Sequence, residues 1–165
     1  MVALPGDSPP KQHAIPKELA HVLVHPHSFA GRLIGIAIAW VEEEWKAREQ
    51  IRTKAVVTGW NPKLKAAYKE ATLTTEGLAH RIDNVSLSKL RRSLADVGAA
   101  SPGEIIRAAR LCLAERLLRE TRLMVWEVAR RAGYSSEKHF ATKFSLTFGC
   151  SPSEYRRLSK PQQGA

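Results

Sequence analysis

The sequence contains an internal repeat. Residues 73–105 align with residues 123–155, fifty positions later and without a gap. Such self-similarity indicates that one supersecondary unit occurs twice. Seven of the 33 aligned positions are identical, and apolar residues pair at positions such as Leu94 and Phe144. Because the matches fall at structurally meaningful positions, we interpret the two segments as copies of one helical unit rather than as a chance similarity of two amphipathic stretches.

Each copy has the pattern of two short helices joined by a tight turn. In the second copy, Val125, Val128 and Ala129 have the spacing of one buried helical stripe. Gly133 can adopt the left-handed conformation that ends a helix. The next helix runs to about Phe148, and its phenylalanines, four residues apart, predict a face that packs against the core. Two helices in this arrangement form a helix-turn-helix.

The second helix of each copy predicts a DNA-reading face. The major groove admits one α-helix, so a helix anchored by one side can present its other side to base edges. In the first copy this side carries Ser88, Lys89, Arg91 and Arg92, and in the second it carries Glu137, Lys138, His139, Thr142 and Lys143. Where these helices begin, phosphates can bind to backbone N–H groups. The start positions are Ser86 in the first copy and Ser135 or Ser136 in the second.

A longer helix is predicted between the copies, from Pro102 to about Glu120. Ser101-Pro102-Gly103-Glu104 has the sequence of a capping box with proline at the first helical position, and Ser151-Pro152-Ser153-Glu154 repeats this signal. A helix of roughly 18 residues spans about 27 Å. That length is compatible with two reading helices in successive major-groove segments, which repeat about every 34 Å.

The positive charge is concentrated in the part of the chain that contains the repeat. The formal net charge is +10, and residues 61–165 account for +9 of it, with 19 basic and 10 acidic residues. Such a surplus predicts a polyanionic partner such as nucleic acid. A solvent-exposed helix face is the simplest interpretation for several of the basic residues. These are Arg107, Arg110, Arg116, Arg119 and Arg122.

Three stretches carry a family resemblance. They are Ala109-Arg-Leu-Cys-Leu-Ala-Glu-Arg-Leu-Leu-Arg-Glu-Thr121, Val125-Trp-Glu-Val-Ala-Arg-Arg-Ala-Gly-Tyr-Ser-Ser136 and Phe140-x-x-x-Phe144-x-x-x-Phe148-Gly-Cys-Ser-Pro-Ser-Glu-Tyr-Arg-Arg157. With them, residues 62–158 resemble the DNA-binding domain of AraC/XylS-type transcriptional regulators. The resemblance implies a seven-helix domain with two helix-turn-helix units, sequence-specific binding of double-stranded DNA, and activation of transcription through contacts with RNA polymerase. The family's contact positions fall on Ser88, Arg91, Arg92, Glu137, Lys138, His139 and Thr142, which the face analysis also selects.

The sequence departs from the family pattern at several positions. The first copy is the more divergent, since Asp83 and Asn84 stand at its turn, where the second copy has Gly133 and Tyr134. Its second helix has leucines in place of the first two phenylalanines. In the second copy, Met124 stands where the family often has a capping serine. Trp126 stands where a smaller residue is common, and we expect it to pack against the linker helix.

The predicted fold is all-α, with two helix-turn-helix units joined by a long linker helix and preceded by a short helical extension. We divide the chain into residues 1–60, a proline-rich leader with this extension, and residues 61–160, the DNA-binding domain. Helical patterns cover residues 17–24 and 29–54. Sixty residues are too few for the β-rich effector domain that family members often carry.

The N-terminal extension has three interpretations. It could cover the DNA-binding domain, form a homodimer contact through residues 17–54, or dock another protein. Packing within the chain is the simplest of the three.

Membrane and secreted proteins do not fit this sequence. The apolar run Leu33–Val41 is far shorter than the roughly 20 residues that cross a bilayer, and the N-terminus has no signal-peptide pattern. Two cysteines, Cys112 and Cys150, are too few for a disulfide scaffold, and we interpret them as inert core residues. A cytoplasmic protein without a membrane partner is therefore expected.

Metal and enzyme sites also find little support. His21, His25 and His27 invite a metal interpretation, but Pro26 interrupts their helix and no cysteine or carboxylate cluster accompanies them. The sequence has no nucleotide-binding, hydrolase or metalloprotease motif. Some DNA-repair methyltransferases carry a related domain, but they need a separate catalytic domain for which this chain has no room. We expect no metal, no cofactor and no enzyme activity.

The sequence thus predicts a transcription regulator that binds double-stranded DNA and reads the major groove with two recognition helices. The alternative is a protein-interaction or sequestering module with degenerate DNA binding. The divergent first copy and the missing effector domain motivate that alternative.

Overall fold

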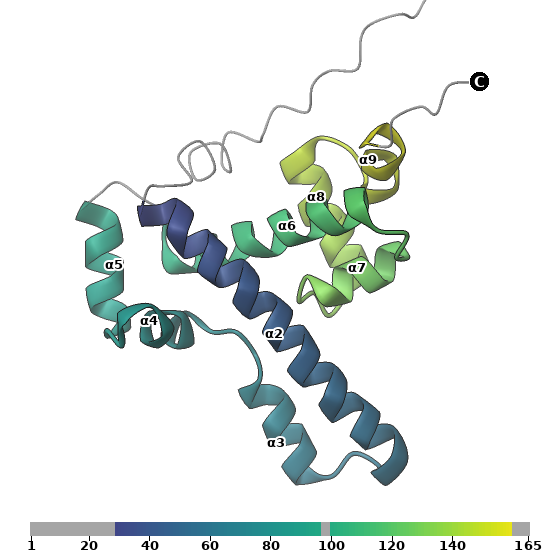
Figure 1. Ribbon diagram of the computed structural model, residues 1–165, viewed down its shortest axis with the longest axis horizontal. Helices are drawn as coiled ribbons and strands as arrows, with labels where there is room; N and C mark the ends of the chain where they lie inside the picture. Colours follow the sequence, from purple (N-terminus) through teal and green to yellow (C-terminus); the bar gives the residue numbers. More distant parts are fainter. Residues whose placement is uncertain (1–28, 97–99, 160–165) are drawn as a thin grey trace, which may run out of the picture.

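A computed structural model describes residues 29–96 and 100–159, and in these ranges every regular element is a helix. The helices are α2 (Phe29–Thr58), α3 (Pro62–Glu70), α4 (Thr75–Asp83), α5 (Leu87–Asp96), α6 (Pro102–Glu120), α7 (Val125–Arg131), α8 (Glu137–Phe148) and α9 (Pro152–Ser159). Helices α4–α5 and α7–α8 form the two helix-turn-helix units, and α6 joins them (Figure 1). The predicted fold class is confirmed. Residues 17–24 lie outside the described residues.

Side chains at the helix starts explain where several helices begin. At α6 the predicted capping box is complete, since Ser101 Oγ accepts from the N–H of Glu104 and Glu104 Oε2 accepts from the N–H of Ser101 at 2.8 Å. At α3, Asn61 Oδ1 accepts from the N–H of Leu64 at 2.9 Å, and Pro62 follows as the first helical residue. These contacts pair backbone donors that a helix start leaves unsatisfied.

Helix α6 supplies apolar side chains to two separate hydrophobic clusters. The first contains Ile105 and Leu113 of α6 together with residues of α2, α4 and α5. The second contains Leu111 and Leu118 of α6 together with residues of α7, α8 and α9. Each helix-turn-helix unit thus has its own core, and the linker helix belongs to both.

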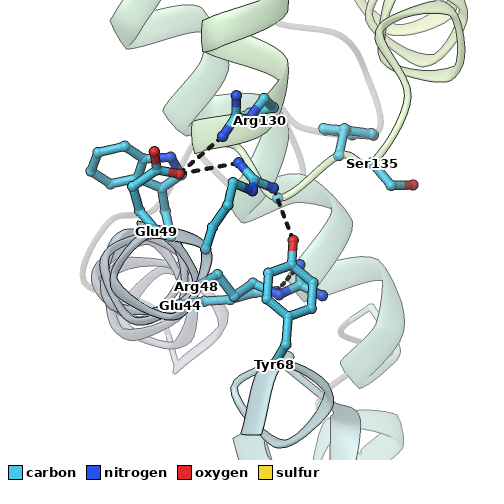
Figure 2. Close-up of a pocket in the computed structure, with 10 residues that line it drawn as sticks. Glu44, Arg48, Glu49, Tyr68, Arg130 and Ser135 are labelled. Atoms are coloured by element: carbon cyan, nitrogen blue, oxygen red, sulfur yellow. Dashed lines mark hydrogen bonds and ion pairs between the residues drawn. The ribbon is translucent and has the colours of Figure 1, made fainter. Parts of the chain in front are cut away.

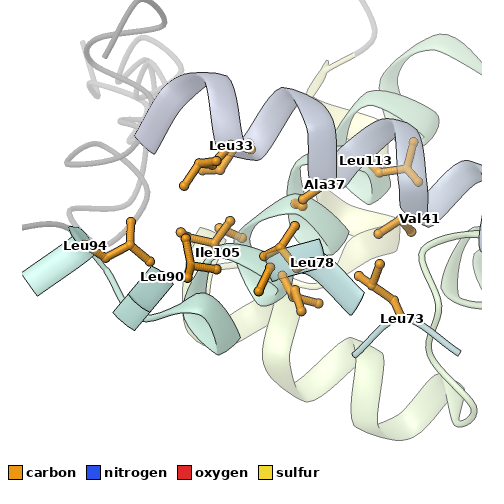
Figure 3. Packing of buried hydrophobic residues seen from close by; sticks show 14 residues of the cluster. Leu33, Ala37, Val41, Leu73, Leu78, Leu90, Leu94, Ile105 and Leu113 are labelled. Carbon is orange, nitrogen blue, oxygen red and sulfur yellow. The ribbon is translucent and has the colours of Figure 1, made fainter. Parts of the chain in front are cut away.

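The N-terminal half of α2 packs inside the molecule. Leu33, Ile34, Ala37 and Val41 are buried in the first cluster, where they face Leu78 of α4 and residues of α6 (Figure 3). The extension therefore covers the helix-turn-helix region, as the simplest of the three interpretations has it. A homodimer through residues 17–54 stays a prediction. Within residues 29–54 its contacts would have to lie outside the buried face of α2.

The C-terminal end of α2 differs from its beginning. Val56 and Val57 are 82 % and 83 % exposed, and α2 and α3 together form a hairpin that extends away from the two units (Figure 1). None of the helices in the described part of the chain is long and apolar enough to cross a membrane.

Two valines of α2 provide a matched test of its role in the core. Replacing the fully buried Val41 by alanine removes apolar contacts and leaves a cavity, so we expect Val41→Ala to lower the free energy of unfolding by ~2 kcal/mol. Val57→Ala, at a position 83 % exposed on the same helix, should have almost no effect. Urea denaturation followed by circular dichroism measures both, and equal effects would show that α2 is not part of the core.

The cysteines provide a second test of the fold. Cys112 packs against the first cluster, where burial, with a smaller contribution from Glu115, raises its pKa to about 11. Burial also raises the pKa of Cys150. Because the thiolate is the nucleophile, iodoacetamide at pH 8 should alkylate Cys112 roughly tenfold or more slowly in the folded chain than in urea. Peptide mass spectrometry gives both rates, and similar values would contradict the inert role.

Candidate nucleic-acid interface

Helix α8 is anchored by one side and capped at both ends. Ser136 Oγ accepts a hydrogen bond from the N–H of His139 at 3.3 Å, and Gly149, with φ +75°, ends the helix. Phe140 and Phe144 are completely buried in the second cluster, and Phe148 packs against both clusters. The phenylalanine stripe predicted from the sequence is confirmed.

The other side of α8 is open to solvent. Every residue that the sequence analysis selects in this unit is exposed, which holds for Ser135, Ser136, Glu137, Lys138, His139, Thr142 and Lys143. The Thr142 hydroxyl donates to the carbonyl of Lys138 at 3.0 Å, so these two residues lie one above the other on the exposed face. Donors, acceptors and a cation stand together there, as base-edge recognition requires.

Helix α5 repeats this arrangement in the first unit. Ser86 Oγ accepts from the N–H of Lys89 at 3.3 Å, the equivalent of the Ser136 contact. Leu90 and Leu94 are buried in the first cluster in place of the phenylalanines. The predicted contact residues, Ser86, Ser88, Lys89, Arg91 and Arg92, are all exposed.

The cations on these two faces have no acidic partner. None of Lys89, Arg91, Arg92, Lys138 and Lys143 forms an ion pair with a carboxylate in the described part of the chain. Their charges therefore remain available to a polyanion.

The two units lie apart in space. Figure 1 shows α5 on one side of α2 and α8 on the other, with α6 passing between the units. Helix α6 has 19 residues, as long as predicted, and at 1.5 Å per residue it is about 28 Å long.

The turns of the two units differ in position. In the second unit Gly133 adopts the left-handed conformation, with φ +81°, three residues before the capping Ser136. In the first unit the left-handed residue is Asn84, with φ 50°, two residues before Ser86. Asparagine tolerates this conformation better than most residues do. The gapless alignment therefore holds for the helix starts but not for the turn, because the equivalent of Gly133 is Asp83.

The solvent-exposed interpretation of the linker arginines is wrong for Arg110, whereas the side chain of Arg116 is 42 % exposed. Arg110 lies 3.3 Å from Glu44 of α2, a carboxylate whose side chain is only 1 % exposed. Arg116 forms an ion pair with Glu42 of the same helix. The expectation failed for Arg110 because the charge pattern of one helix does not reveal a glutamate on another helix that packs across it. In contrast, Arg107 and Arg119 are mostly exposed.

Two further expectations concern the start of α7. Met124 provides no side-chain cap, and instead its N–H donates to Glu127 Oε2 at 2.7 Å, so the carboxylate of the first turn takes over part of the missing role. Trp126 belongs to neither core cluster and is 45 % exposed, with the Arg130 guanidinium 5.5 Å from its ring. The expected packing of Trp126 against the linker helix stays a prediction.

Helices α2 and α3 meet the turn of the second unit around a cavity of about 190 Å³. Glu49 of α2 pairs with both Arg52 of α2 and Arg130 of α7, with oxygen-to-nitrogen distances of 3.1 and 2.9 Å, and Arg52 also donates to the Tyr68 hydroxyl. Figure 2 shows Glu49, Tyr68 and Arg130 around the cavity. Ser135 lines this cavity, which places one predicted DNA contact beside the extension.

Sequence reasoning missed the acidic residues of α2 as partners of the helix-turn-helix units. The signal was the run Glu42–Glu44, followed by Glu49, in a chain whose second part has a large positive surplus. The metal interpretation of His21, His25 and His27 lies outside the described residues. Within the described residues no group of three metal-binding side chains occurs.

Comparison with known proteins supports this assignment of the fold. A family profile described as a helix-turn-helix domain matches residues 80–158, from the last turn of α4 into α9.

Three curated relatives match parts of the chain. The transcriptional activator RhaR of Mannheimia succiniciproducens is 36% identical over 76 residues, which are 46% of this chain and 28% of RhaR. The regulator AlkR of Acinetobacter baylyi is 34% identical over 93 residues, or 56% of this chain and 30% of AlkR. The activator RclR of Escherichia coli is 29% identical over 119 residues, 68% of this chain and 42% of RclR. The chain thus spans less than half the length of each relative, and all three are named as transcriptional regulators or activators rather than enzymes.

A solved structure has the same fold. The C-terminal domain of AraT, a response regulator from Geobacillus stearothermophilus, has a TM-score of 0.52 and 21% identity, and the match covers 84% of this chain and 94% of that chain. Helices α3 to α9 are the seven helices that the sequence resemblance implies. Residues 80–158 therefore match a helix-turn-helix domain, and the resemblance to AraC-type regulators is confirmed over this part of the chain.

Proposed function

We propose that this chain is a sequence-specific regulator of transcription that reads the major groove of double-stranded DNA with α5 and α8. One observation carries the proposal. Both helices bury an apolar side in a core and turn outward a side whose cations form no ion pair with any carboxylate of residues 29–96 and 100–159. The named functions of RhaR, AlkR and RclR support the same conclusion.

Phosphates and bases have different roles in the proposed complex. At the starts of α5 and α8, which Ser86 and Ser136 cap, backbone N–H groups and the helix dipole hold phosphates and fix the position of each helix. Arg91 and Arg92 can pair with guanine, and Glu137 can accept from cytosine. Contacts of this second kind give the sequence preference, since phosphate contacts are the same at every base pair.

The length of α6 sets the expected form of the DNA site. A linker helix of about 28 Å is comparable with the major-groove repeat of about 34 Å. The two recognition helices then read two blocks of bases about one helical turn apart. Contacts with RNA polymerase and a homodimer stay predictions of the resemblance and of the sequence analysis.

Selection of random duplex DNA by the purified protein tests the proposal. We expect an enriched sequence of two blocks about one helical turn apart, with an affinity that falls as salt rises. A single enriched block would assign the reading to one helix alone. Weak binding without any sequence preference would reject the proposal and favour a protein-interaction module.

Single substitutions test the assignment of the reading faces. Arg91→Ala and Lys138→Ala should each raise the Kd for the enriched site by about fivefold or more, because each removes a base or phosphate contact. Lys46→Ala is the matched control, since Lys46 is an exposed cation on α2 and belongs to neither recognition helix. Fluorescence anisotropy gives the three affinities, and circular dichroism confirms the fold. Unchanged binding by both variants would show that the faces are wrongly assigned.

A further inference from the structure

One buried carboxylate connects α2 with the second helix-turn-helix unit. The side chain of Glu44 is 1 % exposed, and each of its oxygens faces a different guanidinium. Oε1 lies 3.0 Å from Arg48 of α2 itself, and Oε2 lies 3.3 Å from Arg110 of α6. A charge this deeply buried persists only when it is paired, so the two arginines and the carboxylate hold one another in place.

Arg110 contacts both Glu44 and the turn before α8. Its Nη1 donates to the carbonyl oxygen of Gly133 at 2.9 Å, while its Nη2 faces Glu44. The guanidinium also lies against the turn, because a Cβ added to Gly133 would come within 3.0 Å of Arg110 Cζ. A planar guanidinium can donate in two directions at once, which a single ammonium group cannot do in the same geometry.

Other residues of α2 contact the same unit. Glu49 pairs with Arg130 at 2.9 Å, and the Arg131 guanidinium lies 4.5 Å from the ring of Trp45. Both arginines belong to the last turn of α7, directly before Gly133. The first unit contacts α2 through Arg81, which pairs with Glu43 and lies 5.3 Å from the ring of Trp40, but this ion pair is half exposed on both sides, unlike that of Glu44.

We infer that Glu44 and Arg110 are positioning residues for the recognition helix α8. The carboxylate fixes the guanidinium, the guanidinium fixes the carbonyl of Gly133, and Ser136 starts α8 three residues later. Helix α2 thus determines how α8 is presented to DNA, whereas α5 does not depend on this contact. The inference rests on the proposed function, since it concerns the same DNA-reading site.

The test compares two neighbouring glutamates on three duplexes. One duplex carries both selected blocks. In another the second block is scrambled, and in the third the first block is scrambled. Lys138 lies on α8, so Lys138→Ala weakens binding only while the block that α8 reads is intact. Scrambling that block removes the difference between this variant and the wild type, which identifies the block. Glu44→Gln should weaken binding about tenfold wherever that block is present, because misplaced base contacts lose much of their value. It should leave binding unchanged where the block is scrambled. Glu43→Gln is the control and should bind all three like the wild type.

A purely structural role of Glu44 gives a different result. In that case Glu44→Gln weakens binding to all three duplexes equally, in proportion to the loss of folded protein that thermal unfolding measures. Equal weakening, or no weakening in a folded variant, would overturn the inference.

Two further measurements keep the test decisive. If Glu44→Gln does not fold, Arg110→Lys keeps a positive charge beside Glu44 but gives up one of the two contacts, and the same block-selective loss is expected.

Amide hydrogen exchange needs no DNA. Relative to Glu43→Gln, the Glu44→Gln or Arg110→Lys variant should exchange faster at residues 133–140 and at the same rate in α5. Unchanged exchange at residues 133–140 would overturn the inference, whereas absence of a selected sequence with the wild type would reject the proposed function alone.

Discussion

Two apolar clusters share one helix, and the rest of the structure depends on this constraint. Helix α6 contributes Ile105 and Leu113 to one cluster and Leu111 and Leu118 to the other. Because both clusters use the same rigid helix, neither unit can rotate about α6 without exposing apolar surface or opening a void, and close-packed interiors resist both. Helix α6 thus forms part of both cores, and its packing determines the distance and angle between the recognition helices.

Two groups of arginines in the domain have different roles. Arg81, Arg110, Arg116 and Arg130 lie on α4, α6 and α7 and pair with glutamates of α2. Arg91 and Arg92 of the α5 reading face form no ion pair among the described residues. The positive surplus of residues 61–165 is therefore not one uniform basic surface, because the glutamates of α2 neutralise part of it and leave the cations of the recognition helices unpaired.

Features that depend on neighbouring residues could be predicted from the sequence, and features that depend on distant ones could not. The capping box at Ser101 and the end of α8 at Gly149 involve contacts within a few positions, so the sequence shows them directly. The exposed reading faces of α5 and α8 could be predicted because the apolar stripes opposite them are visible in the sequence. The burial of Glu44 results from how separate helices pack. An arginine such as Arg110 has the same pattern whether it faces water or a carboxylate 66 residues away.

The distribution of acidic residues on α2 has a consequence for how the molecule meets DNA. Carboxylates of α2 pair with cations on α4, α6 and α7, whereas the cations of α5 and α8 form no ion pair among the described residues. A polyanion attracts unpaired cations more strongly before any contact forms, so encounters are biased toward orientations in which a recognition helix arrives first. The glutamates of α2 thus raise the fraction of productive collisions by pairing with cations outside the recognition helices, although α2 itself has five basic and four acidic residues.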